Sequence, residues 1–157
     1  MLAALKARFN GADDFCLREL TAGGQVLYAL FLDGMTSGSD ISDFVVRPLM
    51  ENLRPGTPEE LYAQAQRGAV WCAVCEEADS AEAAADKLTH GYCVVVFPGL
   101  AKALCFEAKS GTRRGPSAPE SENTVKGAKD AFTETIRINT ALVRRHLRTP
   151  ELRLVNK

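Results

Sequence analysis

The sequence has no apolar run long enough to cross a bilayer. Its longest runs, 26–32 and 92–97, have the length of strands, whereas a membrane-spanning helix needs about 18 apolar residues or more. The first 14 residues, MLAALKARFNGADD, also lack the sustained apolar segment of a signal peptide. We therefore expect this chain itself to be soluble and to begin with a short helix.

An excess of charge of either sign is also absent. The 157 residues carry 19 Lys and Arg against 20 Asp and Glu, a formal net charge of −1. Such a balance gives no general reason to expect a nucleic-acid partner, although the C-terminal part is locally basic. Hydrophobic residues make up 46% of the chain, which is enough for the core of one ordinary domain or of two very small ones.

Cysteine is present in an odd number, five residues spread along the chain. This number and spacing favour free thiols in a reducing compartment over a disulfide framework. The segment from Trp71 to Cys75 resembles the W-C-x-x-C motif of thioredoxin-like oxidoreductases, so a redox enzyme using Cys72 and Cys75 is one alternative function. The surrounding residues, 69–75, look like a strand, in which residues three apart point to opposite faces. We therefore favour structural thiols.

Other catalytic and metal-binding patterns are missing. His90 and His146 lie far from the Cys72–Cys75 pair, so a four-ligand zinc site is not indicated. No Ser-His-Asp set, phosphate loop or dinucleotide fingerprint occurs. We expect a protein that is not an enzyme and uses neither a metal nor another cofactor.

Local patterns predict most of the helices and strands. A hairpin is expected from strands 15–21 and 25–32, and a helix from Ser39 or Asp40 to Asn52, kinked or shortened by Pro48. Thr57 and Glu60 form a capping-box pattern for a helix to about Arg67. Further on, the expected elements are a strand at 69–75, a helix at 80–88, and strands at 92–97 and 101–108.

These elements predict an α/β protein of two small subdomains with short mixed sheets, plus a C-terminal basic helix. The subdomains would span 1–54 and 68–108, the linker 109–123, and the helix about 131–148. The helix shows two faces. An apolar face, expected to pack, contains Phe132, Ile136, Val143 and Leu147. A second face, expected to present arginine, contains Arg137, Ala141, Arg144 and Arg148.

The segment 119–152, reading PESENTVKGAKDAFTETIRINTALVRRHLRTPEL, resembles a pattern of the A subunits of the GerA-type spore germinant receptors. The matching residues are Pro119, Glu120, Glu122, Val125, Lys126, Gly127, Phe132, Thr133, Glu134, Ile136, Arg137, Asn139, Ala141, Leu142, Val143, Arg144 and Arg145. The N-terminal half is similar to the family at Asp14, Arg18, Glu19, Leu20, Asp33, Gly34, Met35, Ile41, Pro48 and Leu49. The likeness thus extends over nearly the whole chain.

This resemblance implies a non-enzymatic, N-terminal soluble domain with two linked α/β subdomains, similar to substrate-binding proteins. Such A subunits act with B and C subunits in the inner membrane of dormant spores, where nutrients trigger germination. The family chain continues into transmembrane helices, so we expect this domain on the cytoplasmic, spore-core face. Its expected partners are the B and C subunits, a small nutrient germinant and, through the C-terminal part, the membrane.

The candidate site residues lie near and within the basic helix. Glu122, Arg137 and Asn139 are candidate contacts for a ligand or a partner, although Glu122 and Arg137 also suit a structural ion pair. A solvated or lipid-facing basic cluster is expected from Arg144, Arg145 and Arg148, next to the membrane. A peripheral membrane-binding module remains the second alternative function.

Overall fold

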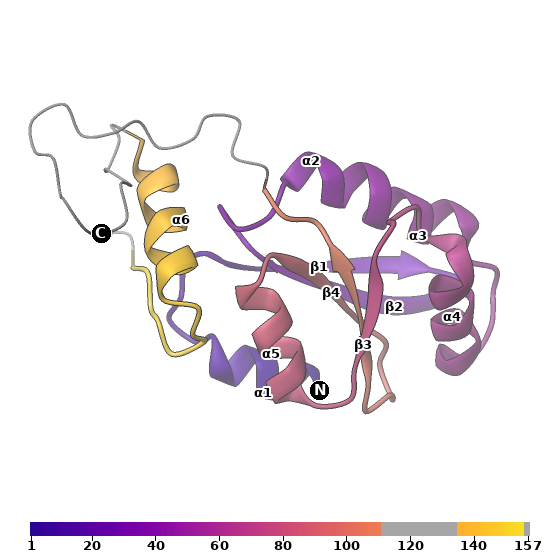
Figure 1. The fold of residues 1–157 in the computed structure, drawn as a ribbon. Helices are drawn as coiled ribbons and strands as arrows, with labels where there is room; N and C mark the ends of the chain where they lie inside the picture. The colour runs from indigo at the N-terminus through magenta and orange to yellow at the C-terminus, as the bar shows by residue number, and fades with distance from the viewer. Residues whose placement is uncertain (111–134, 156–157) are drawn as a thin grey trace, which may run out of the picture.

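The computed structural model describes residues 1–110 and 135–155, and its centre is one five-stranded sheet (Figure 1). The spatial order is β1-β2-β4-β5-β3, and each neighbouring pair is antiparallel. The strands are β1 (Phe15–Ala22), β2 (Gln25–Leu32), β3 (Cys75–Ala78), β4 (Tyr92–Val96) and β5 (Ala103–Glu107).

Helices cover both faces of this sheet (Figure 1). They are α1 (Leu2–Arg8), α2 (Gly38–Asp40), the π-helix η1 (Ile41–Val46), α3 (Arg47–Asn52), α4 (Pro58–Gln64), the π-helix η2 (Ala65–Ala69), α5 (Ala81–Thr89) and α6 (Ile136–His146). The segment from α2 to η2 packs on one face, and α1 and α5 pack on the other. Within the described ranges, no helix is both long and apolar enough to cross a bilayer.

The central strand β4 shows why the sheet needs cover on both sides. All five of its residues are buried. Cys93 and Val95 face the core under α2 to η2, whereas Val94 and Val96 face the core under α1 and α5. Alternate residues of a strand point to opposite faces, so a strand that is apolar throughout requires a layer on each side.

The expected α/β class is confirmed, but the expected short mixed sheets are one antiparallel sheet. Segments 1–54 and 68–108 contribute strands to it jointly, because β2 pairs with β4 from Tyr28↔Val96 to Leu30↔Val94. Leu30 is completely buried, as is Leu32 at the end of β2. The hairpin alone would leave these apolar residues and the backbone edge of β2 in water, whereas pairing with β4 covers both.

The expected helices before residue 110 are found with small shifts in their bounds, whereas the C-terminal helix, expected at about 131–148, is α6 at 136–146 in the described residues. Ser37 is the N-cap of the helix at 38–52, rather than Ser39 or Asp40, and its hydroxyl accepts a hydrogen bond from the Asp40 N–H. The wide turns of η1 lie directly before Pro48, whose ring removes one backbone donor, so the chain stays helical across the proline. The capping box of Thr57 and Glu60 is confirmed by both of its hydrogen bonds.

The strand expected at 69–75 is wrong, because β3 begins only at Cys75. Residues before it form a connection in which Val70 is buried. The Cys72 thiol donates a hydrogen bond to the Glu107 carbonyl oxygen at 3.1 Å. The buried side chain of Val70 and the hydrogen bond of the Cys72 thiol thus hold this segment in place, although it forms no strand.

The turn of the β1–β2 hairpin yields a stability prediction. Gly23 and Gly24 both have positive φ, +57° and +76°, which costs an L-residue about 1–2 kcal/mol. A Cβ at Gly23 would lie 2.4 Å from Leu61 Cδ2, whereas a Cβ at Gly24 would meet no atom within 4 Å. Gly23→Ala should therefore lower the free energy of unfolding by about 1–3 kcal/mol more than Gly24→Ala in urea titrations. Equal losses would contradict this packing.

Candidate functional site

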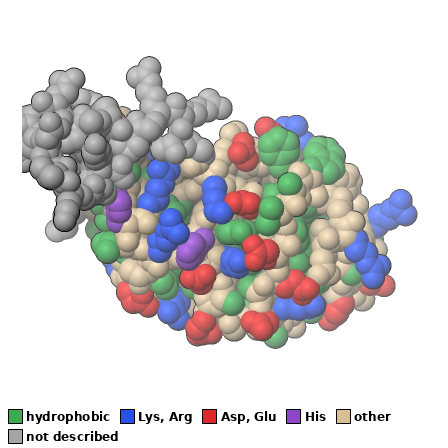
Figure 2. All heavy atoms as spheres, in the orientation of Figure 1, with side chains coloured by type: hydrophobic (Ala, Val, Ile, Leu, Met, Phe, Trp, Pro, Cys, Tyr) green, Lys and Arg blue, Asp and Glu red, His purple; other side chains and the backbone are tan. Residues whose placement is uncertain are grey.

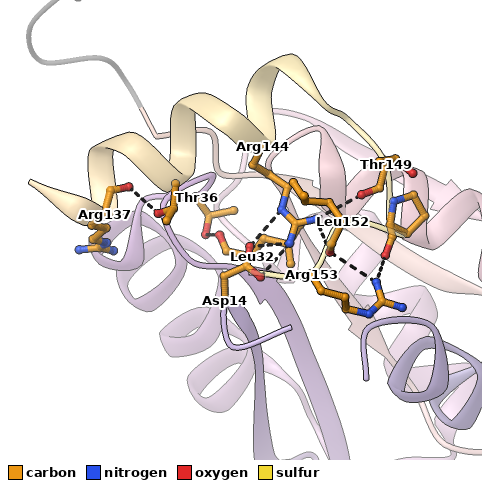
Figure 3. A network of polar contacts seen from close by, with 10 residues as sticks. Asp14, Leu32, Thr36, Arg137, Arg144, Thr149, Leu152 and Arg153 are labelled. Atoms are coloured by element: carbon orange, nitrogen blue, oxygen red, sulfur yellow. Dashed lines mark hydrogen bonds and ion pairs between the residues drawn. The ribbon is translucent and has the colours of Figure 1, made fainter. Parts of the chain in front are cut away.

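The helix α6 is fixed to the domain through the side chain of Arg144, which is completely buried (Figure 3). Its Nε donates to Asp14 Oδ2 at 3.0 Å, and its Nη2 donates to both carboxylate oxygens of Asp14 at 2.7 Å. Asp14 stands just before β1 and its side chain is only 11% exposed. This is a buried, bidentate arginine–carboxylate pair, the geometry in which such pairs are strongest.

The remaining N–H groups of Arg144 hold the chain that follows α6. Its Nη1 donates to the Thr149 carbonyl at 3.2 Å and to the Leu152 carbonyl at 3.3 Å, as Figure 3 shows. These contacts use every donor of the guanidinium group. The turn after α6 therefore folds around one side chain, and the Asp13 N–H donates to the Leu154 carbonyl at 2.9 Å beside it.

The last described residues also contact α1. Arg153 Nη2 donates to the Arg8 carbonyl at 2.7 Å, and Arg8 Nη2 lies 3.2 Å from Glu151 Oε1. The N-terminal helix, the start of β1 and the segment after α6 are thus connected by polar contacts between residues far apart in the sequence.

At its N-terminal end, α6 approaches the loop after β2. Arg137 Nη2 lies 2.5 Å from Asp33 Oδ1, and both side chains are largely exposed. A hydrogen bond of 2.8 Å from the Asp33 N–H to the Asp14 carbonyl joins the two aspartate-bearing segments. Helix α6 therefore meets two acidic side chains, one buried and one at the surface.

Between these two pairs, α6 touches the backbone closely at Gly34. This glycine has φ +80°, and a Cβ built on it would lie 3.2 Å from the Cβ of Ala141. Ala141 and its neighbour Leu142 are buried. Small residues on both sides let the helix approach, so that the arginines on either side of Ala141 reach their aspartates.

The face by which α6 packs differs from the expected one, of which only Val143 is half-buried. Ile136 and Leu147, expected to pack, are 72% and 54% exposed, and Phe132 lies outside the described residues. The stripe of Arg137, Ala141 and Arg144 makes the contact instead. The reason is chemical: the surface under the helix offers two carboxylates and a glycine, and it is complementary to arginine and alanine.

The structure separates the members of the expected basic cluster. Arg144 is buried and paired, so its expected exposure to solvent or lipid is wrong. Arg145 is half-buried and Arg148 is exposed, and Arg148 Nε donates to the Arg145 carbonyl at 3.1 Å. Asn139 is half-buried on α6 two residues after Arg137, and Glu122 lies outside the described residues. Asp14 and Asp33, the partners of the arginines, were not among the sequence-derived site residues, although both belong to the resemblance.

The surroundings of Cys72 and Cys75 in the described structure differ from those of a thioredoxin-like motif. Cys72 lies in a connection and Cys75 begins an edge strand, so no helix N-terminus is present to stabilise a thiolate. Partial burial, with Cys72, Glu77 and Glu76 nearby, raises the pKa of Cys75 to about 11. Burial also raises the pKa of Cys105 to about 12. Across residues 1–110 and 135–155, no group of three or more His, Cys, Asp or Glu residues is placed to hold a metal ion.

The fold and the site define a class: a small antiparallel α/β domain closed by its own C-terminal helix through a buried arginine–aspartate pair. The chain belongs to the GerA family, described as the Bacillus/Clostridium GerA spore germination protein, whose model matches residues 3–157.

Two curated relatives from Bacillus subtilis (strain 168) span nearly all of the chain. The uncharacterized membrane protein YfkQ is 29% identical over 148 residues, which cover 94% of this chain and 28% of that protein. Stage V sporulation protein AF is 28% identical over 141 residues, which cover 90% of this chain and 28% of that protein. The chain therefore spans less than a third of the length of these relatives.

A solved structure shares the fold. It is the crystal structure of the N-terminal domain of the A subunit of the Bacillus megaterium spore germinant receptor GerK3, with a TM-score of 0.68 and 21% identity. The match covers 97% of this chain and 55% of that one. The likeness shows that the α/β architecture described above also occurs in that domain.

Removing the Arg144 side chain should loosen the domain severely. Arg144→Gln leaves the Asp14 carboxylate buried without a counter-charge, and breaking a buried pair in this way costs about 3–5 kcal/mol. The adjacent Arg145 forms no ion pair with a described carboxylate, so Arg145→Gln is a matched control that should change stability by less than about 0.5 kcal/mol. Urea unfolding measures both, and similar small losses would contradict the role of Arg144.

The Cys75 thiol should react slowly in the native fold. Because its pKa is raised from 9.0 to about 11, its thiolate fraction at pH 8 falls about 100-fold relative to the unfolded chain. Alkylation by iodoacetamide, followed by peptide mass spectrometry, should be correspondingly slower in buffer than in urea, and should accelerate as the pH approaches 11. Faster native alkylation, or a Cys72–Cys75 disulfide formed under mild oxidants, would support the redox alternative instead.

Proposed function

We propose that this chain is a non-enzymatic sensory and assembly domain of a GerA-type spore germination protein. The observation that carries the proposal is the docking of α6 through Arg144 and Asp14 in a chain whose family model matches residues 3–157. The family description and the name of the matched solved domain both refer to germination, which supports this role. The domain acts at the cytoplasmic face of the spore inner membrane, beside the B and C subunits of a receptor complex.

The proposed mechanism uses α6 as the element that couples the domain to the rest of the protein. Its contacts reach β1 through Asp14, the loop after β2 through Asp33, and α1 through Arg153. A nutrient or partner subunit that binds near Arg137 and Asn139, together with Glu122, favours one position of α6 over another. A ligand shifts such an equilibrium only by its difference in affinity between the two positions.

The surface pair of Arg137 and Asp33 permits a test that spares the fold. Arg137→Gln removes an exposed pair, worth at most about 1 kcal/mol, and should leave the protein folded. Arg47→Gln is the matched control, because Arg47, at the start of α3, forms a comparable exposed pair with Asp43 of η1 at 2.9 Å. In spores carrying the full-length variants, nutrient-triggered release of dipicolinic acid should slow several-fold for Arg137→Gln alone.

Immunoblots of the spore membranes check that both variants accumulate equally. Equal germination rates for the two variants at equal protein levels would contradict the proposal that the α6 contact transmits the signal. A germination defect of equal size in both variants would also contradict it, because Arg47 lies outside the α6 contact.

A further inference from the structure

Strand β3 forms one edge of the sheet and buries little apolar surface. In the described residues it pairs only with β5, over four positions from Cys75↔Phe106 to Ala78↔Ala103. Of its four residues only Ala78 is buried, whereas all of β4 and four of the five residues of β5 are buried. A segment with so few buried apolar contacts opens locally at a lower cost than the rest of its sheet. The attachment of β3 therefore comes largely from its backbone hydrogen bonds and its polar side chains.

On the face covered by α4 and η2, the side chain of Glu77 is held by three residues. Tyr62 Oη donates to Glu77 Oε2 at 2.5 Å, Gln66 Nε2 donates to Oε1 at 2.6 Å, and Lys102 Nζ lies 3.1 Å from Oε2. Lys102 Nζ also lies 4.2 Å from the centroid of the Tyr62 ring. That ring is buried in the core, so its hydroxyl connects the core to the edge strand.

On the opposite face, Glu76 is held in a similar way from α5 and β4. Tyr92 Oη donates to Glu76 Oε1 at 2.7 Å, and Lys87 Nζ lies 2.5 Å from Oε2 and 4.9 Å from the centroid of the Tyr92 ring. The pKa of Glu76 is lowered chiefly by the hydrogen bond from Lys87, and the pKa of Glu77 chiefly by the one from Tyr62. Both carboxyl groups are therefore held in their ionised form.

The two carboxylates lie at the surface, where water can replace their contacts. The side chains of Glu76 and Glu77 are 41% and 45% exposed. Figure 2 shows acidic and basic side chains side by side across the middle of the face where β3 lies in Figure 1. Exposed ion pairs contribute little to stability, because water screens them and solvates the separated charges. Releasing β3 therefore costs less than separating two strands whose residues are apolar.

We propose that β3 is a releasable edge of the sheet, which opens together with the connection before it while the other four strands stay paired. The part that opens lies between the buried residues Val70 and Ala78. Its release breaks the contacts of Glu76 and Glu77, and it exposes the backbone groups of β5 that β3 otherwise pairs. This conformational device does not depend on the proposed role in germination.

The backbone of β5 offers a probe for this opening in alternate residues. The Glu107 N–H donates to the Val74 carbonyl at 3.2 Å, on the side of β3, whereas the Ala108 N–H donates to the Gly91 carbonyl at 3.3 Å, on the side of β4. The N–H groups of an antiparallel strand alternate between its two neighbours. The odd-numbered amides of β5 therefore face β3, and the even-numbered amides face β4.

Hydrogen exchange of the 157-residue chain, followed by NMR at neutral pH, tests the opening. After correction for intrinsic rates, the amides of Ala103 and Cys105 should exchange roughly tenfold faster, or more, than those of Leu104 and Phe106. Their rates should depend weakly on added urea, because the opening exposes a small area, whereas Leu104 and Phe106 should show the steep dependence of global unfolding. Equal protection and equal urea dependence of all four amides would overturn the proposal.

A double variant tests whether the two carboxylates hold β3. E76Q/E77Q weakens the contacts on both faces and should speed exchange of the β3-facing amides about tenfold. The matched control is E19Q/E51Q, which removes two exposed carboxylates on β1 and α3, and which should change these rates less than about twofold. Equal effects of the two double variants would overturn the proposal that Glu76 and Glu77 control the edge.

The hairpin variant Gly24→Ala separates the local opening from unfolding of the domain. It destabilises the closed form and the form with β3 released alike, because Gly24 lies in the turn between β1 and β2. It should therefore speed exchange of Leu104 and Phe106 about tenfold and leave Ala103 and Cys105 unchanged. Acceleration of all four amides by the same factor would show that β3 separates only when the domain unfolds, and would overturn the proposal.

Discussion

The buried pair of Arg144 and Asp14 is the constraint on which the C-terminal half of the structure depends. A guanidinium group removed from water must have all of its donors satisfied, and here the carboxylate and two backbone carbonyls do so. That requirement fixes the rotation of α6, the path of the turn that follows it and the position of the segment before β1. The exposure of Ile136 and Leu147 follows from the same requirement, because both lie away from the side of α6 that Arg144 holds against the domain.

The elements encoded by local signals could be predicted from the sequence. The paired glycines identified the β1–β2 hairpin, and the Thr57–Glu60 capping box identified the start of α4. The arrangement of the sheet was less accessible, because the pairing of β2 with β4 depends on residues distant in the sequence. The segment before Cys75 has the composition of a strand, but the burial of Val70 and the thiol contact of Cys72 give it another path.

Two of the arginines at the α6 contact were singled out from the sequence, but their aspartate partners were not. Arg137 and Arg144 were recognised in one half of the chain and Asp14 and Asp33 in the other, each as part of the resemblance to the family. Hydrophobic periodicity assigned the wrong face of α6 to the core. It depends only on the apolar residues of the helix itself, so it gives no information about carboxylates on the surface against which the helix packs. The composition of the helix gives one indication of these contacts. Residues 136–148 contain four arginines and no Asp or Glu, so an arginine that is buried there needs an acidic partner from another part of the chain.

The sequence separation of these contacts also affects the order in which they can form during folding. The β1–β2 hairpin joins neighbours in the chain, whereas Arg144 and Asp14 are 130 positions apart. During synthesis the N-terminal half emerges first and can begin to form its contacts, but Asp14 remains without its counter-charge until α6 has been made. The contacts that close the domain, made by Arg144 and by the residues after it, are therefore among the last that can form, and a chain truncated before Arg144 would leave the Asp14 carboxylate without its counter-charge.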